Sequence, residues 1–202
     1  VKDSTVRRLP PPVDLEASDA ALLGQVIDYY HATLKTSPEA LAYLKKRGID
    51  SPDAVSRFKL GFANRTLGLR LPAKTRVEGV RIRHRLTSLG IIRTSGHEAY
   101  NGCLVIPVLD EQGQVVEIYG RKIRDDLRDG TAYHLYRWGG DRPAGRRGVW
   151  NLDALRASKE VILCEALIDA LSFWCAGFQN VASSYGINGF TAEHLEAFKA
   201  YG

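Results

Sequence analysis

The stretch that decides the fold, residues 161–186, is VILCEALIDALSFWCAGFQNVASSYG. Residues 161–164 are short and wholly apolar, which is typical of a buried strand. Residues 166–176 follow with apolar side chains at helical spacing, and residues 181–183 form a second short apolar run. Thr191 is a suitable N-cap for a further helix. Strand, helix, strand and helix at this spacing predict a parallel strand pair joined by a right-handed crossover.

Two carboxylates follow the first of these strands. Glu165 comes directly after it, and Asp169 lies four residues later, on nearly the same face of the helix. Ligands bind at this end of the strands in open α/β sheets. Two carboxylates so close together repel unless a divalent cation neutralises them, and Mg²⁺ takes a few carboxylates with water and phosphate oxygens. Alternatively, Asp169 serves the helix dipole and Glu165 caps the helix. The spacing alone leaves both hypotheses open.

The middle of the chain predicts a β-hairpin. Residues 103–108 form an apolar strand, residues 110–113 a turn, and residues 115–119 the returning strand. Residues 124–148 show little periodicity and predict a long loop.

Helices are predicted before the hairpin. Residues 1–17 contain three consecutive prolines and predict an extended tether. Ser18 caps a helix that ends near Leu34. Ser-Pro pairs start two more helices within residues 37–61, which together predict a small helical subdomain. Residues 80–89 predict a further helix with a basic outer face.

Composition excludes several classes of protein. The chain has 202 residues, of which 45% are hydrophobic and 25% charged, as in ordinary globular proteins. Its longest apolar runs are far shorter than the roughly 18 residues of a membrane span, so we expect a cytoplasmic protein with no membrane partner. Three widely spaced cysteines predict neither a disulfide framework nor a zinc site.

Charge is distributed unevenly along the chain. Residues 65–93 hold eight lysines and arginines against one acidic residue, whereas residues 150–202 hold three against six. A basic middle beside an acidic end suits a phosphate-binding groove next to a divalent-metal site. Alternatively, the basic residues of the first stretch are solvent-exposed side chains on helix surfaces and bind no ligand.

The C-terminal motifs resemble the first half of a TOPRIM domain, the metal-binding fold shared by DnaG-type primases, some topoisomerases and certain nucleases. The resemblance rests on CEALIDA (164–170), WCAGF (174–178) and VASSYG (181–186). It implies that Glu165 is the catalytic glutamate and that Glu165 and Asp169 bind Mg²⁺ or Mn²⁺. Ala166 stands where the family usually has glycine. The family's Asp-x-Asp strand does not occur before Gly202, so we expect this fragment alone to be inactive.

The preceding residues resemble the amino-terminal part of the bacterial DnaG-type primase catalytic core, which topoisomerases lack. The matching motifs occur in the family's order: PEALAYLKKRG (38–48), FKLGFA (58–63), GCLVIPV (102–108) and YGR (119–121). The resemblance implies that the parent protein is a DNA-directed RNA polymerase. Its partners would be a single-stranded DNA template, nucleoside triphosphates and a replicative helicase.

Basic residues are the candidates for holding template or nucleotide phosphates. They are Arg121, Lys122, Arg47, Arg81, Arg83 and Arg85. Arginine suits this task because its planar fork pairs with two phosphate oxygens. For Arg47 the alternative is a cation at a helix C-terminus.

The expected fold class is therefore α/β with an α+β forepart. Residues 1–17 would be a tether, residues 18–149 the forepart with its helices and hairpin, and residues 150–202 the truncated first β-α-β-α half of a TOPRIM domain. Ala132 occupies the place of a lysine in cellular primases, and residues 67–72 and 134–136 look more like primase-related proteins of plasmids and other mobile elements. The alternative function is a non-catalytic, nucleic-acid-binding TOPRIM accessory protein of a mobile element.

Overall fold

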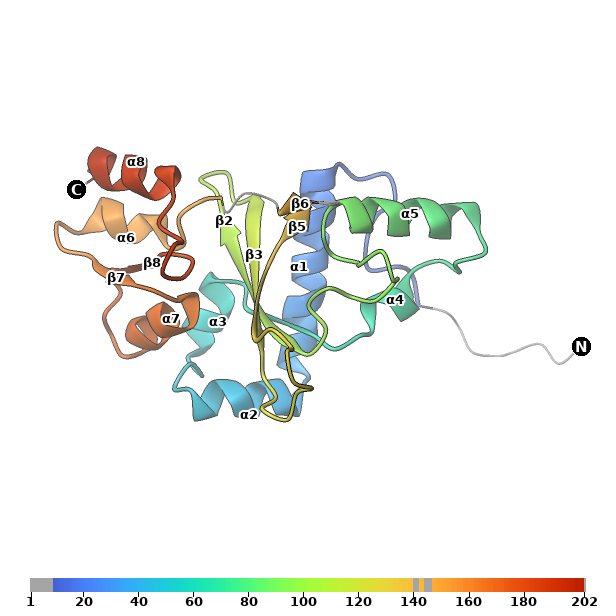
Figure 1. Cartoon of the computed structure of the whole chain (residues 1–202), viewed down its shortest axis with the longest axis horizontal. Coiled ribbons are helices and arrows are strands. Elements are labelled where there is room, and N and C mark those ends of the chain that lie inside the picture. The colour runs from blue at the N-terminus through green and yellow to red at the C-terminus, as the bar shows by residue number, and fades with distance from the viewer. Residues whose placement is uncertain (1–8, 140–141, 144–146, 202) are drawn as a thin grey trace, which may run out of the picture.

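The computed structural model describes residues 9–139, 142–143 and 147–201. Figure 1 shows its helices and strands in three groups along the long axis of the molecule. The elements in chain order are α1 (Asp19–Lys35), α2 (Pro38–Lys46), α3 (Pro52–Arg57), β1 (Gly61–Ala63), α4 (Leu67–Arg70), α5 (Val77–Ser88), β2 (Cys103–Leu109), β3 (Val115–Lys122), β4 (His134–Tyr136), β5 (Trp138–Gly139), β6 (Arg142–Pro143), α6 (Leu152–Ala157), β7 (Ile162–Cys164), α7 (Leu167–Cys175), β8 (Val181–Ser183) and α8 (Ala192–Tyr201).

A four-stranded antiparallel sheet in the order β1-β2-β3-β4 lies in the middle of the molecule (Figure 1). β2 and β3 form the predicted hairpin, which is confirmed. Its turn uses the Asp110 carboxylate, which accepts hydrogen bonds from the backbone N–H groups of Gln112 (3.0 Å) and Gln114 (2.8 Å). Gly113 has φ +74°, a conformation that favours glycine.

Two strands of this sheet were not predicted. β1 lies where the sequence indicated only the end of a helix, and β4 lies inside residues 124–148, so the prediction of a continuous loop there was wrong. Each strand has three residues, which is too short to give a period-2 pattern. They form because the hairpin's two outer edges carry unpaired backbone groups that another segment can satisfy.

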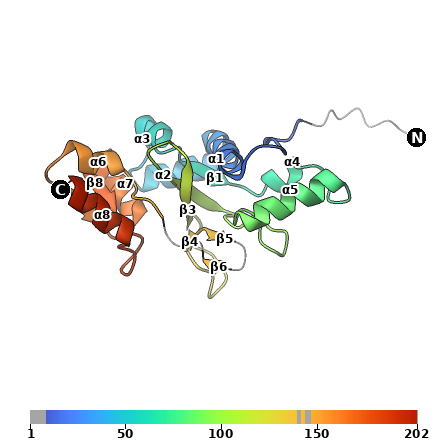
Figure 2. The same cartoon turned by 90° about the horizontal axis from the view of Figure 1, so that it is seen from above.

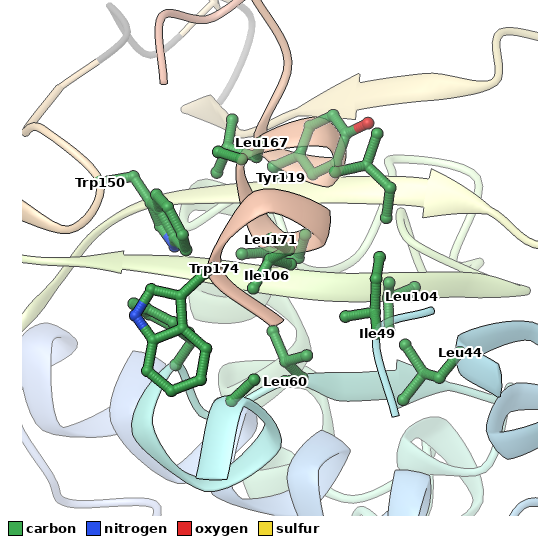
Figure 3. Close-up of a cluster of buried hydrophobic side chains, with 14 of the residues drawn as sticks. Leu44, Ile49, Leu60, Leu104, Ile106, Tyr119, Trp150, Leu167, Leu171 and Trp174 are labelled. Atoms are coloured by element: carbon green, nitrogen blue, oxygen red, sulfur yellow. The ribbon is translucent and has the colours of Figure 1, made fainter. Parts of the chain in front are cut away.

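Apolar clusters cover both faces of the sheet, and side chains of β2 alternate between them. Leu104 and Ile106 belong to the cluster beneath α2, α3 and α7, whereas Cys103 and Val105 belong to the cluster beneath α1, α4 and α5. Figure 3 shows the first cluster, with α7 lying over β2 and β3. Because both faces of β2 are buried, the side chains on both faces are apolar, which explains the continuous apolar run at residues 103–108.

The C-terminal region, residues 150–202, has the predicted β-α-β-α order, and β7 and β8 are parallel, which confirms that prediction. Cys164 is the last residue of β7 and pairs with Ser183 of β8. Thr191 is the N-cap of α8, since its Oγ1 accepts from the backbone N–H of His194 (3.4 Å). α6, which was not predicted, packs against α8 at one end of the molecule (Figure 2).

Trp150 joins this C-terminal region to the forepart. Its side chain is 2% exposed, and its ring centroid lies 4.3 Å from that of Phe58 at the end of α3. Phe58 also meets Trp174 of α7 edge-on, at 5.4 Å between centroids. The forepart and the C-terminal region therefore share one apolar cluster (Figure 3). A domain boundary at residues 149–150 stays a prediction.

The start of the chain is irregular but anchored. Residues 9–17 contain neither helix nor strand, and Val13 is buried. The backbone N–H of Asp14 donates to Gln25 of α1 (2.7 Å), so this part of the predicted tether lies along the protein. Residues 1–8 of that tether lie outside the described residues. Among the helices that the structure describes, none is long and apolar enough to cross a membrane.

His194 is a buried, neutral histidine that joins α8 to β8. Its Nε2 lies 3.0 Å from the carbonyl oxygen of Ser183, and its Nδ1 lies 2.7 Å from Thr191 Oγ1. A carbonyl only accepts, so Nε2 carries the proton and Nδ1 accepts from Thr191. Burial lowers the pKa of His194.

Stability should therefore decrease between pH 7 and pH 5. The pKa of His194 is lower in the folded chain than its unfolded value of about 6.5, so the unfolded chain takes up the proton first. The stabilisation that neutral His194 gives to the folded chain is present above about pH 6.5. It is lost as the pH falls through the pKa of His194 in the folded chain. Thermal unfolding of the wild type and of His194→Gln should show a smaller decrease in the variant. The exposed His84→Gln is the control, and identical pH curves for His194→Gln and wild type would count against this assignment.

Candidate metal-binding and nucleic-acid-binding site

The local fold fixes the backbone of the acidic pair and leaves its carboxylates free. Glu165 lies in the turn between β7 and α7, and its carbonyl oxygen accepts from the Gly186 N–H (2.9 Å) and the Ser184 hydroxyl (3.2 Å). Asp169 lies in the first turn of α7. Both side chains are exposed, and neither carboxylate has a hydrogen bond or an ion pair to a described residue.

The structure distinguishes the alternatives for Glu165. The N-cap of α7 is Ala166, and no side-chain cap hydrogen bond is made there, so Glu165 does not cap this helix. Asp169 lies where the helix dipole favours an anion, and this explanation of Asp169 is compatible with a metal-binding one. The carboxylate of Glu165 is thus available for another role.

A hard divalent cation fits this donor set. Mg²⁺ binds to one or two carboxylates and keeps water or phosphate oxygens in its other positions. Within residues 9–139, 142–143 and 147–201, no three histidine, cysteine, aspartate or glutamate side chains lie close enough together to hold a metal ion. The pair of carboxylates therefore suits a weakly held cation shared with a phosphate group.

The two basic residues at the end of β3 point to opposite faces of the sheet, because neighbouring side chains of a strand alternate. Arg121 pairs with Leu104 of β2 and lies on the α7 face. Lys122 pairs with Cys103 on the other face, where its Nζ donates to the carbonyl oxygen of Asn101. The sequence grouped these two residues, but the structure places them in two separate basic sites.

On the α7 face, Arg121, Arg47 and Asp169 all act on the imidazole of His134. The pKa of His134 is lowered, first by burial, then by Arg121 and Arg47, while Asp169 raises it. Asp169 and Arg121 also act in opposite directions on the pKa of the neighbouring Tyr119. The carboxylate and both arginines therefore act on one point, the imidazole of His134 on β4.

Two buried polar atoms at this point have no partner among the described residues. They are Arg121 Nε and the hydroxyl oxygen of Tyr43, whose ring lies 5.7 Å from the guanidinium carbon of Arg47. Buried polar groups are normally hydrogen-bonded. The unpaired Arg121 Nε and Tyr43 hydroxyl, together with Arg47 and the exposed Asp169 carboxylate, are consistent with a site for a polar ligand.

On the opposite face, Lys122 lines a cavity of about 790 Å³. Further cations line it as well: Arg65, Lys74, Arg83 and Arg93. Glu98 is buried in its wall, where it accepts from the Gly68 N–H and the Tyr30 hydroxyl (both 3.3 Å), and burial raises its pKa. Arg65, Lys74 and Arg93 belong to the basic stretch of the sequence but were not singled out, since charge alone does not show which side chains face one cavity.

The three arginines of α5 contact the protein itself. Arg83 donates to the carbonyl oxygens of Pro72 (2.6 Å), Gly79 (3.0 Å) and Gly68 (3.0 Å). Arg85 and Arg81 hold the start of the chain. Arg85 donates to the carbonyls of residues 15 and 17 and to the Asp19 carboxylate, and Arg81 pairs with Glu16. Their predicted role on nucleic acid stays a prediction.

We expect Arg83→Ala to lower the free energy of unfolding by about 2–3 kcal/mol, because it leaves three carbonyl oxygens without a charged donor. Arg81→Ala is the matched control, since the Arg81 ion pair is exposed and should contribute at most about 1 kcal/mol. Urea unfolding of both variants measures the difference. Equal losses would contradict a structural role specific to Arg83.

The fold and site define a protein whose C-terminal region, residues 150–202, is Toprim-like and carries the exposed carboxylates of Glu165 and Asp169, while the basic side chains lie on a separate sheet. Residues 162–202 match the Toprim-like family. Residues 29–132 match the family described as DNA primase catalytic core, N-terminal domain, and this chain belongs to that family.

Individual relatives agree with this assignment. The DNA primase of Aquifex aeolicus is 29% identical over 174 residues, which cover 81% of this chain and 33% of that protein. A solved structure of the DnaG catalytic core has a TM-score of 0.72 at 22% identity, over 91% of this chain and 59% of that one. A DnaG primase catalytic domain bound to single-stranded DNA has a TM-score of 0.70, also at 22% identity, over 91% of this chain and 60% of that one. The chain thus spans about a third of the length of the Aquifex primase.

Proposed function

We propose that this chain is the part of a DNA primase that binds template and nucleotide and contributes Glu165 and Asp169 to the joining of ribonucleotides. The parent protein would then be a DNA-directed RNA polymerase. The observation that carries this proposal is that Asp169 of α7, Arg121 of β3 and Arg47 at the end of α2 all act on His134, beside two buried polar atoms that have no partner among the described residues.

Mg²⁺ or Mn²⁺ would be held by Glu165 and Asp169, whose carboxylates have no other partner among the described residues. When bound, the ion would neutralise the charge of a triphosphate and favour ionisation of the attacking hydroxyl. Arg121 and Arg47 would hold phosphate oxygens, since charge-assisted hydrogen bonds from a planar guanidinium favour this geometry.

The two basic sites are suited to two different phosphate-containing ligands. Arg121 lies with Asp169 and is suited to the nucleotide, whereas Lys122 lines the large basic cavity and is suited to the template phosphates. The Aquifex relative is a DNA primase, and one solved structure with this fold holds single-stranded DNA, which supports a template of that kind. Arg81, Arg83 and Arg85 would extend the template groove along α5. Arg81 is the most exposed of the three.

The remaining features of the parent protein follow from the proposal. A primase works in the cytoplasm beside a replicative helicase, and we infer both for this protein. Residues 67–72 and 134–136 favour a primase of a plasmid or another mobile element. The tether, the forepart and the Toprim-like region would divide at residues 17 and 149.

The parent protein should join ribonucleotides on a single-stranded DNA template. The assay is dinucleotide synthesis from nucleoside triphosphates with Mg²⁺ or Mn²⁺, with a template-free reaction as the control. Template-dependent product is the expected result. Binding of single-stranded DNA without synthesis under either ion would instead indicate a non-catalytic accessory protein.

A further inference from the structure

His134 connects the guanidinium of Arg121 to a buried tyrosine. In the ladder between β3 and β4, Arg121 lies directly opposite His134. His134 Nε2 lies 2.8 Å from Arg121 Nη1, and His134 Nδ1 lies 2.8 Å from the hydroxyl oxygen of Tyr119. The three side chains form a continuous hydrogen-bonded line along one face of the sheet.

Chemistry fixes the direction of these hydrogen bonds. A guanidinium only donates, so His134 Nε2 accepts from Arg121 and carries no proton. In a neutral imidazole, Nδ1 then carries the proton and donates to Tyr119. The ring is held neutral because burial, Arg121 and Arg47 all lower the pKa of His134, against the opposing effect of Asp169. The Arg121 contact thus sets the tautomer, and the Tyr119 hydroxyl, which can donate or accept, is compatible with it.

Tyr133 restrains Arg121 from a second side. Its ring centroid lies 5.1 Å from the guanidinium carbon of Arg121, within the range of a cation–π contact. Its hydroxyl donates to the carbonyl oxygen of Asp125 (3.1 Å), which keeps the ring in place. Residues 133 and 134 together fix the plane of the guanidinium.

These contacts leave one terminal nitrogen of Arg121 without a partner among the described residues. Nη1 is used by His134 and Nε is buried, whereas Nη2 makes no hydrogen bond to any residue that the structure describes. Nη2 can donate a charge-assisted hydrogen bond to an oxygen of a phosphate group. Fixing Nη1 therefore orients this donor in advance of binding.

We infer that His134 is a positioning residue, which holds Arg121 in the orientation that binds a phosphate group next to Asp169. The inference rests on the proposed function and adds to it the residue that orients its arginine. The phosphate group belongs either to a nucleoside triphosphate or to a template strand, and both present the same oxygens to the arginine. Ordering the side chain in advance reduces the entropy lost on binding.

Titration of the ¹⁵N-labelled chain with ATP, and separately with a ten-nucleotide oligothymidylate, tests this inference by NMR. Arg121→Ala should weaken binding of one of the two probes by about 10-fold or more, which identifies the source of the phosphate. For that probe, His134→Ala should weaken binding by about 3- to 10-fold. His134→Gln should stay within about twofold of wild type, because its amide oxygen can accept from Arg121 and its amide nitrogen can donate to Tyr119.

Two further measurements exclude a general effect on folding. His84→Ala, at an exposed histidine of α5, should bind as wild type does. The ring ¹⁵N shifts of His134 should indicate the Nδ1–H tautomer, and the Arg121 side-chain signals should be restrained in wild type and His134→Gln but averaged in His134→Ala.

The outcomes separate the inference from the proposed function. If Arg121→Ala weakens binding and His134→Ala does not, His134 has no positioning role. If His134→Gln binds as weakly as His134→Ala, the accepted hydrogen bond is irrelevant and the inference is wrong. If Arg121→Ala binds both probes as wild type does, the assignment of Arg121 within the proposed function fails, and the inference fails with it.

Discussion

Trp150→Ala should lower the free energy of unfolding by about 3–5 kcal/mol, the usual loss for removing a buried aromatic side chain. Trp150 is 2% exposed and packs on Phe58, which in turn packs on Trp174. The substitution thus opens the contact between the forepart and the Toprim-like region. Because domains are typically stable by only about 5–15 kcal/mol, the variant should retain little stability. Urea unfolding followed by circular dichroism measures the loss.

Trp150→Phe is the matched control for this prediction. The indole Nε1 has no hydrogen-bond partner among the described residues, so phenylalanine loses packing but no hydrogen bond. It should cost clearly less than alanine. A loss below about 0.5 kcal/mol for Trp150→Ala, the range of an ordinary surface substitution, would show that the forepart and the Toprim-like region do not depend on this contact.

Glu165→Gln should reduce ribonucleotide joining by the parent protein by about 100-fold or more, since even residues that only support metal ligands contribute about 10- to 100-fold. The substitution keeps the shape of the side chain and removes its charge. It should leave folding intact, because the carboxylate of Glu165 is exposed and has no hydrogen bond or ion pair to a described residue. The assay is template-dependent dinucleotide synthesis with Mg²⁺ or Mn²⁺, alongside a thermal unfolding curve.

Glu160→Gln provides the control, since Glu160 is also exposed but lies before β7, at the other end of the strand from the site. It should synthesise as wild type does. If Glu165→Gln synthesises as wild type does, Glu165 takes no part in the reaction. The position of Asp169 is then explained by its interaction with the helix dipole alone.

Local chemistry was sufficient to predict most of the elements. Ser18 marks the start of α1, and its hydroxyl accepts from Ala21 N–H as an N-cap should. The apolar runs at residues 103–108 and 161–164 correspond to β2 and β7, because burial of a strand on both faces leaves a clear composition. β1 and β4 escaped prediction because each exists through pairing with the hairpin rather than through its own sequence.

The candidate site was predictable only in part, for two physical reasons. Alternation along β3 separates Arg121 from Lys122, and the sequence predicted the strand only as far as Tyr119, before these residues. The contact between Arg121 and His134 depends on the register of β4, a strand that was not predicted. Similarly, nothing in the spacing of Arg83 along α5 indicates that carbonyl oxygens occupy its donors.

Paramagnetic broadening by Mn²⁺ tests most directly whether the exposed carboxylate pair of this primase-family chain binds a divalent cation next to Arg121. Amide signals of the ¹⁵N-labelled chain would be followed during addition of substoichiometric Mn²⁺. We predict that residues 164–170 broaden first and that Arg121 and His134 follow, and that Glu165→Gln removes this pattern. Broadening spread evenly over the exposed carboxylates, or unchanged in Glu165→Gln, would contradict a metal site at Glu165 and Asp169.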